Sequence, residues 1–238
     1  MKSVISGASG DIGRAIARAF AKRGDSLALL YHTGEETINT LVKEIAPFGG
    51  MIVAKKVDLA DAVQIERVLS ELKKEFGAPD VLVNAAGVSI VAPVFDTTAE
   101  AWDKVFAINT RAVFLLSKWA AENMIDGGRI INISSIWGSH PAPCEAAYAS
   151  SKAAVESFTK SFAKEVGSLG VTVNSIAAGL IDTKMNARFT LAEKAEFTEG
   201  LAVKRMGTPE DVAHAALFLS DPASSYISGA VLPVDGGY

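Results

Sequence analysis

SGASGDIG, residues 6–13, decides the fold, because an apolar strand pattern ends where it begins and a helical pattern starts where it ends. The same alternation of short apolar runs and longer helical runs continues along the chain. Strand patterns occupy residues 2–6, 26–31, 51–57, 81–84, 129–134, 172–176 and 230–234. Such alternation predicts a parallel sheet with helices on both faces. No linker, low-complexity segment or repeat divides residues 1–238, so we expect a single doubly wound α/β domain with a seven-stranded parallel sheet.

Composition and charge argue against several classes of function. Apolar residues make up 49% of the chain, and the formal net charge of −4 is spread without blocks. Neither nucleic acid nor a membrane is therefore expected as a partner. No export signal or apolar run of ~20 residues is visible. The lone Cys144 cannot form an internal disulfide, which favours a cytoplasmic location.

The glycine loop stands where a phosphate-binding turn is expected. Glycines between a strand and a helix let backbone amides approach a pyrophosphate at the helix N-terminus. Gly7, Gly10 and Gly13 are spaced more widely than the G-x-G-x-x-G pattern at its start. A tight turn without a ligand is the alternative interpretation.

The end of the second strand indicates which dinucleotide binds. An acid at this place binds the 2′-hydroxyl of NAD, but here the chain carries Tyr31, His32 and Thr33. These residues would tolerate a 2′-phosphate, and Arg14 would add positive charge nearby. NADP(H) is therefore favoured, with NAD(H) as the alternative. His32 as an ordinary polar residue at a strand end stays open.

Tyr148 and Lys152 stand four residues apart, on one face of an expected helix. A neighbouring ammonium favours the phenolate and lowers a tyrosine pKa, which suits proton transfer to a carbonyl oxygen. Ser135 ends a buried strand pattern thirteen residues earlier and would bond the same oxygen. An exposed helix pair and a strand-capping serine are the structural alternatives.

Together these motifs resemble the short-chain dehydrogenase/reductase family. The resemblance covers essentially the whole chain, with the motifs in family order and at family spacing. They are the glycine loop, VDL (57–59), NAAG (84–87), IN (108–109), NISS (132–135), YASSK (148–152), AAGLIDT (177–183) and VDGGY (234–238). The resemblance implies a Rossmann fold and direct hydride transfer between a nicotinamide and a carbonyl carbon. No metal is needed, and the scattered histidines, His32, His140 and His214, do not suggest one.

The resemblance also implies the roles of individual residues. Tyr148 would donate the proton, Ser135 would hold the substrate oxygen, and Asn109 would hold a relay water. Lys152 would lower the tyrosine pKa and bind the nicotinamide ribose. The implied cofactor contacts are Gly7, Ser9, Gly10, Asp11, Ile12, Gly13, His32, Thr33, Asp58, Leu59, Asn84, Ala85, Ala86, Gly87, Tyr148, Lys152, Ile181 and Thr183.

Some positions depart from the family pattern. Asp11 replaces the middle glycine of the loop, so its charge must point away from the pyrophosphate or weaken binding. Gly10 stands where many NADPH-preferring members carry arginine, which counts against the NADP(H) assignment. Ala85 and Ala178 replace a common Asn and Pro. None of these departures removes a catalytic group.

The substrate class is indicated by a closer resemblance. In its length and its INISSIWG strand, the chain resembles bacterial 3-oxoacyl-[acyl-carrier-protein] reductases. Such an enzyme takes a carrier-bound substrate, and Arg111, Lys118 and Arg129 are candidates for docking an acidic carrier, unless they are ordinary solvated charges.

A narrower resemblance is to a branch thought to reduce a 5-aminopentanone group on elongation factor P. In that case Trp137, Cys144 and Glu145 would shape the pocket, with Glu145 attracting an amine. Core packing and a solvated acid are their simpler roles. Reduction of small ketones is a further alternative.

Three further expectations concern assembly, a lid and a competing class. Family members usually form tetramers through two long helices, here roughly residues 102–123 and 149–167, and through the C-terminal strand region, so the resemblance implies a homotetramer. Residues 186–200 are polar and alanine-rich and are expected to form a flexible substrate lid, called the lid segment below. The competing class is a dinucleotide-binding sensor without turnover, which would not need the tyrosine.

Overall fold

The computed structural model describes residues 1–125 and 127–238, and within them seven strands form one parallel sheet. The spatial order is β3-β2-β1-β4-β5-β6-β7. The strands are β1 (Lys2–Ser6), β2 (Ser26–Tyr31), β3 (Ile52–Lys56), β4 (Val81–Asn84), β5 (Gly128–Ser135), β6 (Val171–Ala178) and β7 (Val231–Val234). The seven-stranded doubly wound fold predicted from the sequence is confirmed.

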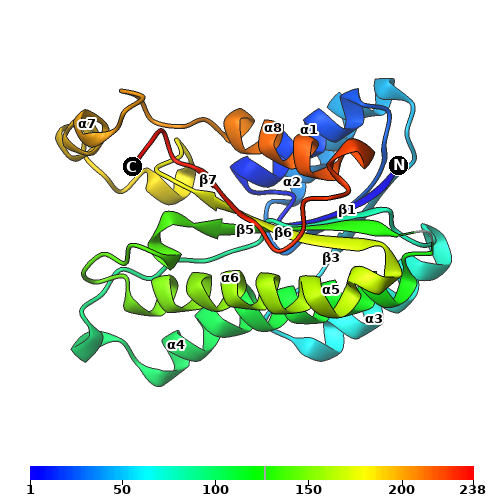
Figure 1. Ribbon diagram of the computed structural model, residues 1–238, viewed down its shortest axis with the longest axis horizontal. Helices are drawn as coiled ribbons and strands as arrows, with labels where there is room; N and C mark the ends of the chain where they lie inside the picture. The colour runs from blue at the N-terminus through cyan, green and yellow to red at the C-terminus, as the bar shows by residue number, and fades with distance from the viewer. Residues whose placement is uncertain (126) are drawn as a thin grey trace.

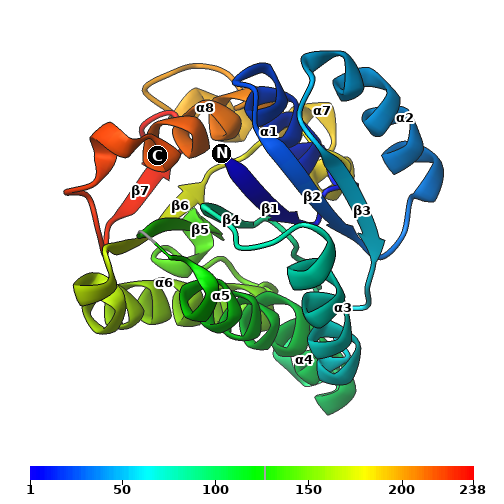
Figure 2. The same cartoon turned by 90° about the vertical axis from the view of Figure 1, so that its right-hand side faces the viewer.

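Helices cover both faces of this sheet. They are α1 (Asp11–Lys22), α2 (Glu35–Ile45), α3 (Ala62–Glu75), α4 (Ala99–Phe106), α5 (Ala112–Asn123), α6 (Ala146–Val166), α7 (Leu191–Gly200) and α8 (Pro209–Ser220). Helices α1, α2 and α8 lie on one face, and α3, α5 and α6 on the other (Figures 1 and 2). Helix α7 lies away from the sheet, near the C-terminus of the chain (Figure 1).

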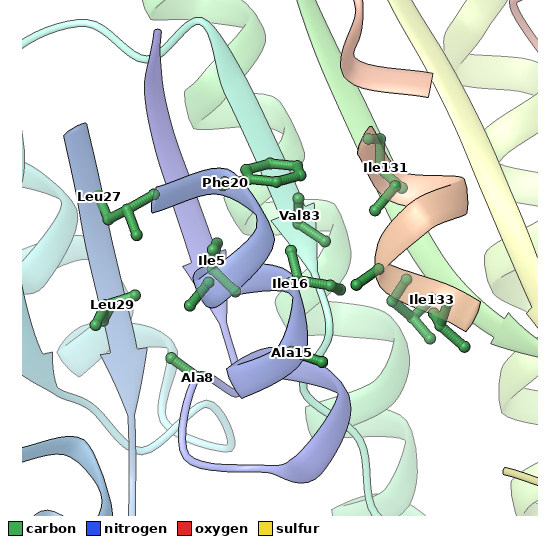
Figure 3. Close-up of a cluster of buried hydrophobic side chains, with 14 of the residues drawn as sticks. Ile5, Ala8, Ala15, Ile16, Phe20, Leu27, Leu29, Val83, Ile131 and Ile133 are labelled. Atoms are coloured by element: carbon green, nitrogen blue, oxygen red, sulfur yellow. The ribbon is translucent and has the colours of Figure 1, made fainter. Parts of the chain in front are cut away.

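The core on the α1 face shows why the first strand and helix patterns predict the fold. Ile16 and Phe20 of α1 are fully buried against Ile5 of β1 and Val83 of β4 (Figure 3). Burying each such side chain contributes about 1.5–3 kcal/mol. The helix is thereby fixed over the centre of the sheet, with the glycine loop at its N-terminus.

The order of the strands places a crevice at the end of β1. The chain builds outward from β1 to β2 and β3, then crosses back to β4 on the other side of β1. Doubly wound sheets bind ligands at this switch point, beyond the carboxyl ends of the strands.

The observed elements differ from the sequence expectations in two places. Helix α2 was not anticipated, although Ile38, Leu41 and Ile45 are buried at helical spacing. The helix expected over 102–123 is interrupted by a π-helical turn, Ala107–Arg111. No helix in the described part of the chain has the length and apolar character needed to cross a membrane.

Candidate functional site

The glycine loop packs against the chain that leaves β4. Gly7 has φ +67°, and a Cβ there would lie 2.6 Å from the Ala86 backbone. A Cβ on Gly13 would lie 2.2 Å from the Gly7 carbonyl oxygen. Both positions require glycine, because any side chain would push the loop away from its neighbours. The Ala8 and Gly10 N–H groups are bonded inside the protein, to Leu30 O and Gly7 O (both 3.0 Å), so the amides that would face a phosphate are those at the start of α1.

A cavity of about 360 Å³ lies against this loop and beyond β1 to β4. Its volume is in the range of small-molecule sites. Most of the sequence-predicted cofactor residues line it: Gly7, Ser9, Gly10, Asp11, Ile12, Gly13, His32, Thr33, Asp58, Leu59, Ala85, Ala86, Gly87 and Thr183. The lining suits a dinucleotide, because the cavity offers the glycine-loop backbone to the phosphates on one side and apolar side chains to the rings on the other.

Asn84 was predicted to contact the cofactor, but its side chain points into the protein interior. Its side-chain amide donates to Ser117 Oγ (3.0 Å) and Asn132 Oδ1 (2.8 Å) inside the protein. Asn84 is fully buried and, in the described part of the chain, does not line either of the two adjoining cavities. Its side chain links β4 to β5 and α5, and Ala85 to Gly87 take over the cavity wall.

The far end of this cavity has no acid at the end of β2. Tyr31, His32 and Thr33 line it, as the sequence indicates. His32 Nε2 lies 3.9 Å from Asp58 Oδ2. Arg14 was expected to add charge here, but its guanidinium is paired with Asp11. The Asp11 carboxylate therefore neutralises the Arg14 charge within the first turn of α1.

The Asp11 carboxylate is bonded to two partners within the protein. One carboxylate oxygen bonds Arg14, and the other accepts a hydrogen bond from the Lys184 backbone N–H at 2.7 Å. Burial opposes ionisation, but these hydrogen bonds outweigh it and lower the pKa of Asp11. The acid in place of the usual glycine thus holds the chain just before the lid segment.

A second, smaller cavity of about 110 Å³ adjoins the first, and Ser135, Tyr148 and Lys152 share its wall. Ile12, Ala85, Gly87, Thr183 and Met185 line both cavities. Ile181, another predicted cofactor contact, lines the smaller one. Ser135 comes from the end of β5, whereas Tyr148 and Lys152 lie on the first turns of α6.

Tyr148 is held as a neutral phenol. Burial raises the pKa of Tyr148 to about 12, the Ser135 hydroxyl opposes this rise, and the Glu145 charge adds to it. The expectation that Lys152 lowers this pKa is not met. Lys152 Nζ lies 5.6 Å from the centre of the tyrosine ring and donates to the Ile133 carbonyl at 2.8 Å. Desolvation therefore dominates the state of the phenol.

Lys152 itself is nearly inaccessible. Burial lowers the pKa of Lys152 to about 8, while the nearby Glu156 carboxylate raises it. Glu156 accepts a hydrogen bond from Ser134 Oγ at 2.9 Å and was not identified from the sequence. Only its helical spacing from Tyr148 and Lys152 on α6 would have indicated it.

Asn109 owes its position to the π-helical turn. Its Oδ1 accepts from Val88 N and its Nδ2 donates to Val88 O, both at 2.9 Å. Nδ2 also donates to Ser151 Oγ at 3.0 Å, which joins the turn to α6. A π-turn often marks a functional position in a helix. Here it turns Asn109 toward the loop after β4, where a Cβ on Gly87 would lie 3.4 Å from Lys152 Nζ.

Above the smaller cavity lies an ion pair that the sequence did not indicate as a unit. Glu145, immediately before α6, bonds Arg188 of the lid segment at 2.5 Å and accepts from Ser89 Oγ at 3.2 Å. All three residues line the smaller cavity. Arg188 and Ser89 were missed because nothing in their local pattern indicates a distant partner.

Aromatic contacts also close this region. Phe197 of α7 stacks on Tyr238 (centroids 5.3 Å apart) and meets Trp137 edge-on (6.3 Å). Trp137 and Phe197 line the cavity.

Cys144 is exposed and has φ +65°, which is rare for a residue other than glycine. Of the three pocket candidates named from the sequence, Trp137 and Glu145 therefore lie in the cavity wall.

The cations proposed for carrier docking are not gathered at the cavities. Arg129 lies at the amino end of β5, opposite the end that carries Ser135. Lys118 pairs with Glu122, and Arg111 bonds the Ala60 carbonyl. In the described part of the chain none of the three lines either cavity. The structure therefore does not bring these three residues together at a cavity wall, since Lys118 lies on α5, Arg111 on the π-helical turn before it, and Arg129 at the opposite end of the sheet.

Comparison with known proteins agrees with this architecture. A family model described as enoyl-(acyl carrier protein) reductase matches residues 7–238. The hydroxynaphthalene reductase-like protein Arp2 of Metarhizium brunneum is 36% identical, with 99% of this chain and 93% of the relative covered. A 3-oxoacyl-[acyl-carrier-protein] reductase of Synechocystis is also 36% identical, over 99% of this chain and 95% of its own length.

A solved structure extends the likeness to three dimensions. A short-chain dehydrogenase from Burkholderia cenocepacia J2315, in complex with NADP, matches with a TM-score of 0.93 and 32% identity. The match covers 99% of this chain and 96% of the other. Full-length similarity of sequence and fold leads to one conclusion: the chain belongs to the short-chain dehydrogenase/reductase family of NAD(P)-dependent oxidoreductases.

Proposed function

We propose that this protein is an NADPH-dependent ketone reductase that reduces a 3-oxoacyl thioester presented on a carrier protein. The observation that carries the proposal is the grouping of Ser135, Tyr148 and Lys152 on one small cavity that opens onto the glycine-loop cavity. When bound, a nicotinamide would supply the hydride for the new C–H bond at the carbonyl carbon. The protein supplies the matching proton at the carbonyl oxygen.

In this proposal Tyr148 is the proton donor and Ser135 holds the substrate oxygen. A phenol with a pKa of about 12 keeps its proton at neutral pH and has it available to give. Lys152, with a pKa near 8, exchanges protons readily at cellular pH and returns one to Tyr148. Asn109 holds the loop beside them and would bind a relay water.

The preference for NADPH rests on the end of β2. Tyr31, His32 and Thr33 stand at the end of β2, where an acid would bond a ribose 2′-hydroxyl and repel a 2′-phosphate, and the Asp58 carboxylate of the same cavity lies 3.9 Å from His32 Nε2. The related Burkholderia enzyme was solved with NADP. Gly10 and the pairing of Arg14 with Asp11 leave the phosphate fewer cations than in many NADPH enzymes, so the expected preference is moderate.

A thioester substrate suits the apolar part of the smaller cavity. Ile133, Trp137, Met185, Phe189 and Phe197 line it around the serine and tyrosine. Such a wall accommodates an acyl chain, whose burial contributes about 0.8 kcal/mol per methylene. The similarity to a 3-oxoacyl-[acyl-carrier-protein] reductase supports the same substrate class.

A second candidate substrate is the 5-aminopentanone group on elongation factor P. The observation that favours it is Glu145, whose side chain is only 6% exposed and lines the smaller cavity. A buried carboxylate must be paired with a cation. A substrate ammonium would meet that need whenever Arg188 swings away with the lid.

Assembly as a homotetramer is part of the same proposal. Phe114 of α5 is 45% exposed, and Phe158 of α6 lies edge-on to it with centroids 6.3 Å apart. Phe158 also stacks on Phe162. An apolar face shared by α5 and α6 would be covered by the same face of a second copy. Light scattering on the purified protein measures the number of copies directly.

The test is oxidation of NADPH and NADH with an acetoacetyl thioester, followed by absorbance, in the wild type and in Tyr148→Phe. Fast NADPH turnover that is lost in Tyr148→Phe, with dinucleotide affinity unchanged, is the expected result. Tyr226→Phe is the matched control, because Tyr226 is fully exposed. A crotonyl thioester tests enoyl reduction. Bound cofactor without turnover on the ketothioester, but with turnover on an aminoketone, would move the assignment to the second candidate.

A further inference from the structure

The Glu145–Arg188 pair connects the lid segment to the helix that carries Tyr148. Glu145 directly precedes α6, three residues before Tyr148, and Arg188 lies two residues into the lid segment. Among the ion pairs of residues 1–125 and 127–238, this is the one that joins the lid segment to the start of α6. Its two ends differ in freedom, since the Glu145 side chain is 6% exposed and that of Arg188 is 35% exposed.

Glu145 is fixed even without its lid partner. Its second carboxylate oxygen accepts from Ser89 Oγ at 3.2 Å, on the loop after β4. Its place at the N-terminus of α6 favours a negative charge. If the lid opened, Arg188 would leave, while Ser89 would still hold the carboxylate, without its cation, in the wall that it shares with Tyr148.

We propose that closing the lid switches the charge around Tyr148, because it brings Arg188 onto Glu145 and thereby neutralises a carboxylate beside the proton donor. The proposal rests on the role of Tyr148 in the proposed function. Glu145 and Arg188 act here as positioning residues, through Tyr148 and without contacting the reacting atoms. The pKa of Tyr148 is thus brought down by Arg188 only when the lid covers the cavity.

The charged groups around the phenol are few. Within the described chain, the titratable side chains that line the smaller cavity with Tyr148 are Glu145 and Lys152, next to and within α6, and Arg188 of the lid segment. Glu145 raises the pKa of Tyr148, and Arg188 lowers it. Removing one member of the pair must therefore shift the tyrosine in the direction opposite to removing the other.

The experiment compares Glu145→Gln, Arg188→Gln, the double variant and Arg188→Lys in the oxidation of a 3-hydroxyacyl thioester from pH 6 to 10. Oxidation needs Tyr148 as the base, so below the pKa of about 12 the rate rises with pH as the phenolate fraction grows, and a shift of this pKa displaces the rise along the pH axis. The rise should move about one pH unit up in Arg188→Gln, about one unit down in Glu145→Gln, and return to the wild-type position in the double variant. Arg188→Lys keeps the charge and should keep the wild-type profile.

Matched controls are Arg18→Gln and Glu44→Gln, which break a similar ion pair (2.7 Å) between α1 and α2, away from both cavities. Proteolysis of the lid segment in the cofactor-free protein provides a readout that needs no turnover. Cleavage should rise equally in the two single variants and in the double variant, because each breaks the same contact.

The outcomes separate the two proposals. Superimposable pH profiles in an active series, with only a rise in KM, would mean a mechanical latch and would overturn the charge switch. Proteolysis unchanged in all three variants would also overturn it, since the lid would not depend on the pair. A wild type that neither reduces the ketothioester nor oxidises its product overturns the proposed function itself, and the switch with it.

Discussion

Asp11 accepts a hydrogen bond from the backbone N–H of Lys184, so the first residue of α1 holds the chain that leads into the lid segment. In the sequence this acid looked like an obstacle to a pyrophosphate. In the structure it is bonded on both oxygens and serves as an anchor between the glycine loop and the base of the lid.

Replacing Asp11 by Gly or Asn separates its two effects. Asp11→Gly removes a charge beside the glycine loop and the bond to Lys184, so dinucleotide affinity should rise roughly fivefold to tenfold while KM for the carbonyl substrate also rises. Asp11→Asn keeps an acceptor for the Lys184 N–H, so affinity should rise with little change in KM. Fluorescence titration with NADPH and steady-state kinetics measure the two. Weaker dinucleotide binding in both variants would contradict this account.

The state of Lys152 sets an upper pH limit for carbonyl reduction. Its pKa is lowered to about 8 by burial, so the ammonium is present below that pH and is lost as the pH rises through it. Reduction at saturating NADPH should therefore fall about tenfold per pH unit above 8, if Lys152 must be charged. A pH profile of kcat measures this limit. A flat profile to pH 10 would mean that the ammonium is not required.

His32 offers a direct test of cofactor choice. His32→Asp places a carboxylate at the end of β2, where it would bond a ribose 2′-hydroxyl and repel a 2′-phosphate. The ratio of kcat/KM for NADPH to that for NADH should fall at least about tenfold, or about 1.4 kcal/mol. His214→Asp, on α8, is the control for a change of charge alone. An unchanged ratio would exclude His32 from the 2′ region.

The capping box of α8 predicts a loss of stability at low pH. Asp211 accepts from the Thr208 N–H at 2.7 Å and pairs with Arg205, and these contacts hold the pKa of Asp211 well below its usual range. The stabilisation is complete above the unfolded pKa near 4 and is lost as the pH falls toward the folded pKa.

Asp211→Ala should therefore reduce the free energy of unfolding by about 1 kcal/mol at pH 7, with a smaller difference from wild type at pH 2 to 3. Urea titrations at the two pH values measure it. An equal difference at both would assign the effect to helix propensity, without a role for the charge.

The sequence predicted the strands closely, because a parallel sheet buried on both faces leaves continuous apolar runs. Residues 2–6, 26–31 and 81–84 coincide with β1, β2 and β4. Helix α2 was missed, since it is polar outside three buried positions. The π-turn around Asn109 was missed for another reason: one extra residue in a helical turn leaves no periodic signal.

The candidate site divides in the same way. Residues that act through a local motif, such as the glycine loop or the Tyr148–Lys152 spacing, were predicted from the sequence. Partners that meet only after folding were not, and Arg188 on Glu145 and Lys184 on Asp11 are the two examples. Their pairing depends on where the lid segment crosses the ends of the strands, which no local pattern encodes.

Cys144 gives the protein a built-in attachment point for spectroscopy. It is the chain's one cysteine, it is exposed, and it directly precedes the carboxylate that holds the lid. A thiol-reactive fluorophore would attach there without any engineered residue, beside the Glu145–Arg188 contact, so its emission should change when the lid segment moves. Opening and closing in single molecules thus become observable in an otherwise native chain.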